Sequence, residues 1–266
     1  MNREISLAFR KCKDEKRPAL LTYIVAGDYN KKKSSQILNS ISEHADIIEY
    51  GMPFNAATAD GPQIQNSSYR ALKGGIKLKD IFRIIKNYKK NKLSKPCILM
   101  GYYQTVFNFG EKNFIRECKR SKVSGCIIVD LPWPENKNFS KLCKKNNITF
   151  VQLISPTTTL KRMREIIKNS DELNYFISML STTGGRLKSS SSKILKQYQM
   201  VKRINPSKKL VIGFGITRKT IKSLKNSDGL VVGSELCKGI SDALKKRQNP
   251  IKKLNKMVKE LKKQIS

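Results

Sequence analysis

The chain has 266 residues, of which 54 are Lys or Arg and 20 are Asp or Glu, so its formal net charge is +34. Hydrophobic residues make up 39% of the chain, which is enough for one sizeable core and excludes a wholly disordered protein. No stretch approaches the roughly 18 uninterrupted apolar residues that span a bilayer, and the first residues lack the apolar centre of a secretion signal, so we expect no membrane association.

Short apolar runs alternate with longer amphipathic stretches along the whole chain, which is typical of buried parallel strands separated by helices. The expected strands are, in order, Ala19–Ala26, Asp46–Gly51, Pro96–Tyr102, Gly125–Asp130, Thr149–Ile154, Tyr175–Met179, Leu210–Gly213 and Gly229–Val232. The main expected helices are Lys33–Ser42, Lys79–Lys89, Phe114–Ser121, Lys137–Lys145, Lys161–Lys168, Ser192–Ile204, Thr217–Asn226 and Ile251–Ile265.

Eight strands, each followed by a helix, predict an α/β fold: a single (β/α)8 TIM barrel over residues 1–266, with an extra helix at the N-terminus. The alternative is an open doubly wound sheet. That fold usually has fewer strands and a glycine-rich first turn, whereas the first turn here reads AGDY and contains no GxGxxG.

The cysteines and the charge favour a cytoplasmic protein without a metal. The six cysteines are scattered without a CxxC pair, and the chain has one histidine, His44, so neither a zinc site nor a disulfide framework is expected. The basic residues run along the whole chain and are mostly Lys, whereas Arg is preferred for bidentate phosphate recognition. We therefore expect no specific nucleic-acid partner, only weak binding of RNA at low salt.

Two acidic residues lie where a barrel carries its active site, at the C-terminal ends of the strands. Glu49 stands near the end of the second strand between apolar residues, and Asp60 lies in the loop that follows. Burial would raise the pKa of Glu49 toward neutrality and suit it to proton transfer. The alternative for Glu49 is a structural hydrogen bond to a neighbouring strand. Asp28 and Asp130 are expected to stabilise turns.

Glycines end the last two strands, where barrels of this kind often bind phosphate. Gly213-Phe214-Gly215 ends the seventh strand, and Gly233-Ser234 ends the eighth just before a short helix. Their N–H groups and the helix dipole favour an anion, and Gly184 after the sixth strand could close the same site. Tyr102 and Tyr175 could line a pocket for a flat apolar group. A small phosphorylated substrate is therefore predicted, although these glycines could serve only tight turns.

The segment DIIEYGMPFNAATADGPQIQ, residues 46–65, resembles the signature of the tryptophan synthase α subunit family. Further matches cover nearly the whole chain: TYIVAGD, RALKGG, LMGYY, VDLP, SPTT, TTGG, GFGI and VVGS. Other phosphate-binding barrels share the last two elements but not ADGPQIQ. The resemblance implies retro-aldol cleavage of indole-3-glycerol phosphate to indole and glyceraldehyde 3-phosphate, in the last steps of tryptophan biosynthesis.

The resemblance also implies roles for individual residues. Glu49 corresponds to the general acid/base that protonates the indole carbon at the bond to be cleaved, and Asp60 to the carboxylate that helps deprotonate the indole nitrogen. Tyr102 and Tyr175 match pocket positions. The positions that match or adjoin the family's phosphate cradle are Gly184, Gly213, Phe214, Gly215, Gly233 and Ser234. The family further implies a partner β subunit that carries pyridoxal phosphate, an α2β2 heterotetramer, and no cofactor in this chain.

The sequence departs from the family pattern in two loops. Asn55-Ala56-Ala57 replaces the family's Ser-Asp-Pro in the loop that normally touches the β subunit, so altered coupling is expected. Residues 179–182 replace a more glycine-rich pattern after the sixth strand. Three alternatives remain: a weakened α subunit that mainly activates its β partner, a basic RNA-associated protein, and a different phosphosugar barrel enzyme.

Overall fold

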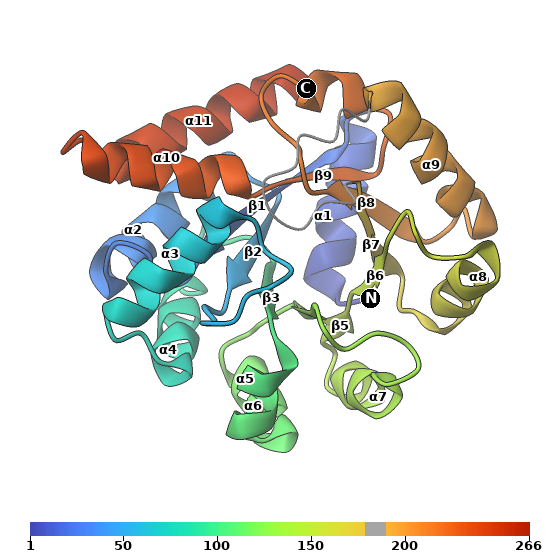
Figure 1. Ribbon diagram of the computed structural model, residues 1–266, viewed down its shortest axis with the longest axis horizontal. Helices are drawn as coiled ribbons and strands as arrows, with labels where there is room; N and C mark the ends of the chain where they lie inside the picture. The colour runs from blue at the N-terminus through green and yellow to red at the C-terminus, as the bar shows by residue number, and fades with distance from the viewer. Residues whose placement is uncertain (179–189) are drawn as a thin grey trace.

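The computed structural model describes residues 1–178 and 190–266, and in these residues it forms a nearly closed barrel of parallel strands (Figure 1). The strands are β1 (Ala19–Val25), β2 (Ile47–Gly51), β3 (Cys97–Gly101), β4 (Gly125–Ile128), β5 (Thr149–Phe150), β6 (Gln152–Ile154), β7 (Leu173–Ile177), β8 (Lys209–Gly213) and β9 (Gly229–Val232). Their order is β5-β4-β3-β2-β1-β9-β8-β7-β6. The predicted TIM barrel is confirmed.

The fifth strand of the barrel is divided, which explains why nine strands occupy eight positions. β5 and β6 are consecutive in the chain and stand at the two ends of the sheet order. Only Val151 separates them, and its N–H donates to the carbonyl oxygen of Cys126 in β4 at 2.9 Å. The predicted strand Thr149–Ile154 is therefore one strand that pairs with β4 through its first half and with β7 through its second.

Helices surround the strands on the outside (Figure 1). They are α1 (Arg3–Asp14), α2 (Lys31–Ile41), α3 (Pro62–Lys73), α4 (Leu78–Tyr88), α5 (Tyr103–Phe109), α6 (Glu111–Arg120), α7 (Lys137–Lys145), α8 (Leu160–Asn169), α9 (Ser191–Ile204), α10 (Ser234–Lys245) and α11 (Pro250–Ile265), with a 3₁₀ turn η1 (Ile221–Leu224). Several helices begin at residues whose side chains accept a backbone N–H, such as Asn30 before α2 and Thr159 before α8.

The extra N-terminal helix α1 covers the end of the barrel where the strands begin, and Figure 1 shows it inside the ring of strands. The backbone N–H of Asn2 donates to Thr149 Oγ1 at 2.7 Å, and Ser124 Oγ donates to Glu4 Oε2 at 2.7 Å. Thr149 and Ser124 lie at the starts of β5 and β4. Ile5 on the inner face of α1 is fully buried. The opposite end of the barrel, where the strands finish, is left for the site.

Two elements differ from the sequence-based expectation. The helix expected over residues 217–226 is wrong, because only Ile221–Leu224 turn as a 3₁₀ helix. The hydroxyl of Thr220 accepts the N–H of Thr217 at 3.0 Å, and such local bonds compete with a helix. The strand expected at Tyr175–Met179 begins earlier, at Leu173, and ends at Ile177.

Candidate active site at the carboxyl ends of the strands

Glu49 is a buried carboxyl group on β2, inside the barrel. It is the third residue of β2 and pairs in register with Tyr23 of β1 and Ile98 of β3. Its side chain is 1% exposed, and neither carboxyl oxygen has a partner among the described residues. Burial raises the pKa of Glu49 to about 8. The carboxyl group therefore carries a proton at neutral pH, and no residue that the structure describes forms the structural hydrogen bond considered as an alternative.

Asp60 is the second buried carboxyl group and is held by the loop between β2 and α3. It is 7% exposed, and the hydroxyl of Tyr102 donates to its Oδ2 at 3.2 Å. Burial raises the pKa of Asp60 to about 6, while the hydrogen bond from Tyr102 opposes that shift. Gln65 fixes the loop, because its amide donates to the carbonyl oxygens of Asp60 and Ala57 at 2.9 and 3.1 Å.

The pKa values of the two carboxyl groups lie on opposite sides of pH 7. At pH 7, Glu49 with a pKa of about 8 is mostly protonated, and Asp60 with a pKa of about 6 is mostly ionised. One can give a proton while the other accepts one, which is the division of roles that acid–base catalysis needs.

Tyr23 is a site residue that the sequence analysis missed. It lies beside Glu49 on β1, is 6% exposed, and burial together with the negative charges of Asp60 and Glu49 raises its pKa. Gly51 makes room for it, because a Cβ there would lie 2.3 Å from the Tyr23 hydroxyl oxygen. A tyrosine near the end of an otherwise aliphatic strand is the signal that could have revealed it, because a buried hydroxyl needs a polar neighbour.

Tyr102 and Tyr175 approach the carboxyl groups from two sides. Tyr102 bonds Asp60 and stacks on Phe54, with ring centroids 5.0 Å apart and planes inclined by 24°. Tyr175 is buried on β7, where burial and then the charges of Glu49 and Asp60 raise its pKa. These rings offer flat, largely apolar surfaces beside both carboxyl groups.

The turn after β8 has the backbone shape of an anion site. Phe214 and Gly215 both have left-handed φ angles, of 67° and 71°. Two consecutive left-handed φ angles form a tight turn, and backbone N–H groups in turns can bind anions. The hydroxyl of Ser178 lies within hydrogen-bond distance of the carbonyl oxygens of Gly213 and Phe214, and its single proton ties the turn to β7 through one of them.

Gly213 has a second reason to be glycine. A Cβ at this position would lie 1.8 Å from the hydroxyl oxygen of Tyr175, so any side chain would displace that ring. The ring of Phe214 meets Tyr175 edge to face, with centroids 6.2 Å apart. The turn therefore shapes the pocket wall as well as an anion site.

The N-terminus of α10 adds a second source of free N–H groups. The helix begins at Ser234 after Gly233, and no side chain in the described part of the chain caps it. The first N–H groups of such a helix carry a partial positive charge that favours phosphate. The predicted short helix is in fact 12 residues long.

The remaining predicted residues are turn formers or lie outside the described part. Asp28 accepts the N–H of Tyr29 at 2.8 Å in the turn after β1 and also pairs with Arg70 Nε at 2.7 Å, and Asp130 accepts the N–H of Tyr103 at 2.7 Å at the start of α5, in keeping with the structural roles expected for both. Gly184 and the altered segment 179–182 lie outside the described residues.

Over residues 1–178 and 190–266, no helix has the length and apolarity to cross a membrane. Within the same residues, His, Cys, Asp and Glu form no group of three or more that could hold a metal ion.

Comparisons with known proteins agree with this architecture. The model of the family described as tryptophan synthase alpha chain matches residues 9–266. The tryptophan synthase alpha chain of Pelagibacter ubique is 60% identical over 262 residues, covering 98% of this chain and 99% of that protein. That of Thermococcus kodakarensis is 38% identical over 248 residues, covering 91% and 95%.

Solved structures of tryptophan synthase alpha chains have the same fold as this chain. Tryptophan synthase subunit alpha from Legionella pneumophila superposes with a TM-score of 0.90 at 27% identity, covering 100% of this chain and 98% of that one. A chain of the tryptophan synthase complex from Pyrococcus furiosus superposes with a TM-score of 0.81 at 33% identity, covering 92% and 98%. The chain belongs to the tryptophan synthase alpha chain family.

Proposed function

We propose that this protein cleaves indole-3-glycerol phosphate into indole and glyceraldehyde 3-phosphate, as a lyase of tryptophan biosynthesis. The observation that carries the proposal is the pair of buried carboxyl groups whose pKa values, about 8 for Glu49 and about 6 for Asp60, lie on either side of neutrality. Protonating a ring carbon while removing the ring N–H proton requires an acid and a base at the same pH.

The proposed reaction is a balanced pair of proton transfers around one carbon–carbon cleavage. Glu49 gives its proton to the indole carbon that bears the glycerol chain, and Asp60 accepts the N–H proton. The hydroxyl of the adjacent glycerol carbon then returns a proton to Glu49. As the carbon–carbon bond breaks, its electrons restore the indole ring, the glycerol carbon becomes an aldehyde, and Asp60 returns the proton to nitrogen.

The surroundings support one orientation of the substrate. The phosphate would bind between the turn at Phe214-Gly215 and the N-terminus of α10, where the first N–H groups of the helix carry a partial positive charge. The indole would lie near Tyr102 and Tyr175, whose rings supply flat apolar surfaces. Tyr23 stands beside Glu49 and would close the pocket from β1.

We also propose a β subunit as the partner, in an α2β2 heterotetramer, with pyridoxal phosphate held by that subunit. The surface that supports this is a cavity of about 430 Å³ bounded by the loop 54–58 and by α3. Tyr69 and Leu72 line it and are 66% and 38% exposed, so they add accessible apolar surface to this cavity. The steps proposed for this chain are proton transfers that its own carboxyl groups can perform. We place the complex in the cytoplasm.

Indole release from indole-3-glycerol phosphate, measured with and without the β subunit of the same organism, tests the proposal. We expect indole in both assays and a faster release with β. Absence of indole in both, from protein whose circular dichroism shows a folded barrel, would overturn the lyase. In that case, stimulation of the β reaction would identify an activator.

A further inference from the structure

A second hollow lies at the opposite end of the barrel from the carboxyl pair. It has a volume of about 480 Å³ and is bounded by the end of α1 and the segment leading to β1, by the end of α9, by the start of β8, and by the turn before β9. These are the N-terminal ends of the strands, so the hollow shares no residue with the proposed active site. We refer to it as the basal pocket.

The basal pocket is far more basic than the chain as a whole. It is lined by six cationic side chains and by one carboxylate, Asp228. In the whole chain the ratio of basic to acidic residues is much lower, at 54 to 20. The cations are Lys13, Lys16, Arg17, Lys202, Lys209 and Lys225.

Half of these cations form ion pairs within the protein. Arg17 forms a bidentate ion pair with Asp46, at 2.7 and 3.0 Å. Asp228 accepts from Lys202 Nζ at 2.6 Å and lies 3.9 Å from Lys209 Nζ.

The other half are Lys13, Lys16 and Lys225. None of the three forms an ion pair with any described residue, although they come from two segments about 210 residues apart in the chain and line the same hollow. Three like charges held in one concavity repel each other and raise the local concentration of anions.

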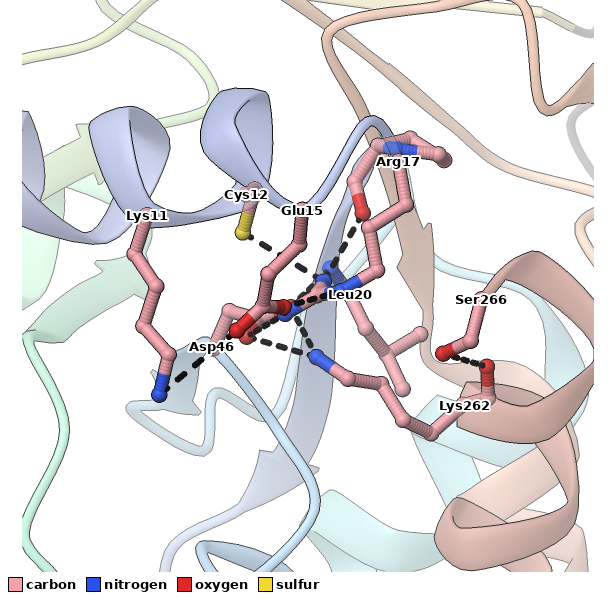
Figure 2. Close-up of polar contacts among 9 residues, drawn as sticks. Lys11, Cys12, Glu15, Arg17, Leu20, Asp46, Lys262 and Ser266 are labelled. Atoms are coloured by element: carbon pink, nitrogen blue, oxygen red, sulfur yellow. Dashed lines mark hydrogen bonds and ion pairs between the residues drawn. The ribbon is translucent and has the colours of Figure 1, made fainter.

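The floor of the basal pocket is rigidly built, as Figure 2 shows for Arg17 and its partners. The Arg17 side chain is 4% exposed and also donates to Pro18 O at 3.1 Å and to Cys12 Sγ at 3.4 Å. Tyr198 fixes the far wall, because its hydroxyl accepts the N–H of Asp228 at 3.0 Å. A ligand would therefore meet a formed surface and would need to order only lysine side chains.

We propose that the basal pocket binds a small polyanion with at least two adjacent phosphate groups. A single phosphate would fill little of a volume that lies in the range of small-molecule sites and would neutralise only part of the free charge. Lysines act on phosphate as point charges and need no bidentate geometry. Phe9 and Pro18 supply an apolar wall against which an organic group could pack.

The test is isothermal titration of inorganic triphosphate into the full-length protein at about 150 mM KCl, where exposed charges are screened beyond about 8 Å. We expect one saturable site per chain. The variant Lys13→Gln/Lys16→Gln/Lys225→Gln should bind at least about tenfold more weakly, since it loses all three free charges. The control Lys112→Gln/Lys119→Gln/Lys141→Gln removes the same charge from exposed positions of α6 and α7 and should bind as the parent does.

Equal weakening in both variants would show a diffuse effect of net charge and overturn the basal pocket, as would the absence of saturable binding. Triphosphate could also enter the proposed active site, so the titration is repeated with saturating glycerol 3-phosphate. An unchanged stoichiometry supports the basal pocket, whereas loss of the site assigns the ion to the other end of the barrel and contradicts the proposal. None of these outcomes depends on indole release.

Discussion

At the scale of single residues, the buried carboxyl group of Glu49 makes the stability of the fold depend on pH. Glu49 has no hydrogen-bond partner among the described residues, and its pKa of about 8 lies well above the ordinary 4.5. Folding at neutral pH therefore requires Glu49 to take up a proton that the unfolded chain does not bind. A group whose folded pKa is raised contributes stability below its unfolded pKa and loses it as the pH rises through the folded pKa.

Replacing Glu49 by Gln should abolish indole release and stabilise the protein. Between a pKa of 4.5 in the unfolded chain and about 8 in the folded one, the difference at pH 7 reaches about 3 kcal/mol. Urea unfolding at pH 4 and pH 7 checks this: the gain should vanish at pH 4. The exposed Glu135→Gln is the control and should change stability at neither pH. Substantial remaining activity would remove Glu49 from the mechanism.

The pH dependence of kcat/KM should be bell-shaped, with limbs near 6 and 8. Below about 6 Asp60 becomes protonated and cannot accept, and above about 8 Glu49 ionises and cannot donate. The phosphate of the substrate also ionises near pH 6, so Asp60→Asn is the control. It should retain phosphate affinity, lose most turnover and lack the acidic limb. An acidic limb with the same midpoint in this variant would belong to the substrate instead.

At the scale of elements, one buried carboxylate ties three segments together at the base of the barrel. Asp46, just before β2, accepts from Arg17, from the N–H of Leu20 and from Lys262 of α11 at 2.6 to 3.0 Å (Figure 2). Burial alone would raise the pKa of Asp46, but these hydrogen bonds outweigh burial and hold it below its usual 3.8.

Asp46→Asn should destabilise the protein by about 3–5 kcal/mol, because it leaves two largely buried cations without their counter-ion. A folded pKa that is lowered gives stability that is present above the unfolded pKa of 3.8 and is lost as the pH falls through the folded value. Urea unfolding at pH 7 should show the full loss. Asp242→Asn, which breaks only the surface pair with Lys238, should change stability by no more than about 0.5 kcal/mol. Equal effects would contradict the buried network.

The loop 55–57 should influence how fast this chain associates with the proposed β subunit. If the family's Asp at this point is an interface charge, Ala56→Asp should change mainly the rate of association with β, since exposed interface charges act chiefly on that rate. Surface plasmon resonance at two salt concentrations measures it, and Asn113→Asp at an exposed position of α6, which adds the same single negative charge, is the control. Identical kinetics for the parent and Ala56→Asp would remove this loop from the interface.

The strands and the two carboxyl groups could be predicted from the sequence, whereas helix α3 and Tyr23 could not, and the difference has physical reasons. Continuous apolar runs marked the strands, and the place of Glu49 and Asp60 at strand ends marked the carboxyl pair before any geometry was known. Helix α3 was missed although Pro62 at its first turn is a start signal, because its face carries small polar residues. Tyr23 was missed because strand alternation does not reveal which side chain meets Glu49 across a neighbouring strand.

At the scale of the whole molecule, the net charge of +34 has no part in the proposed chemistry, which uses two carboxyl groups. Spread over the surface, this charge should bind RNA only by releasing counter-ions. Filter binding of a random RNA should show measurable affinity at low salt and none near physiological ionic strength, with a steep dependence on salt concentration. Affinity that persists at about 150 mM salt would demand a dedicated RNA surface and contradict the expectation that this protein has no specific nucleic-acid partner.

The Asp46 network also sets an order of events during synthesis. The ribosome delivers Arg17 and Asp46 early, yet Lys262 comes 216 residues after Asp46 and after every strand of the barrel. A nascent chain can therefore pair all its strands while the base of the barrel still lacks one of the two cations that Asp46 binds. The contact of Lys262 with Asp46 can form only after α11 has been synthesised, so the barrel reaches its final stability only then.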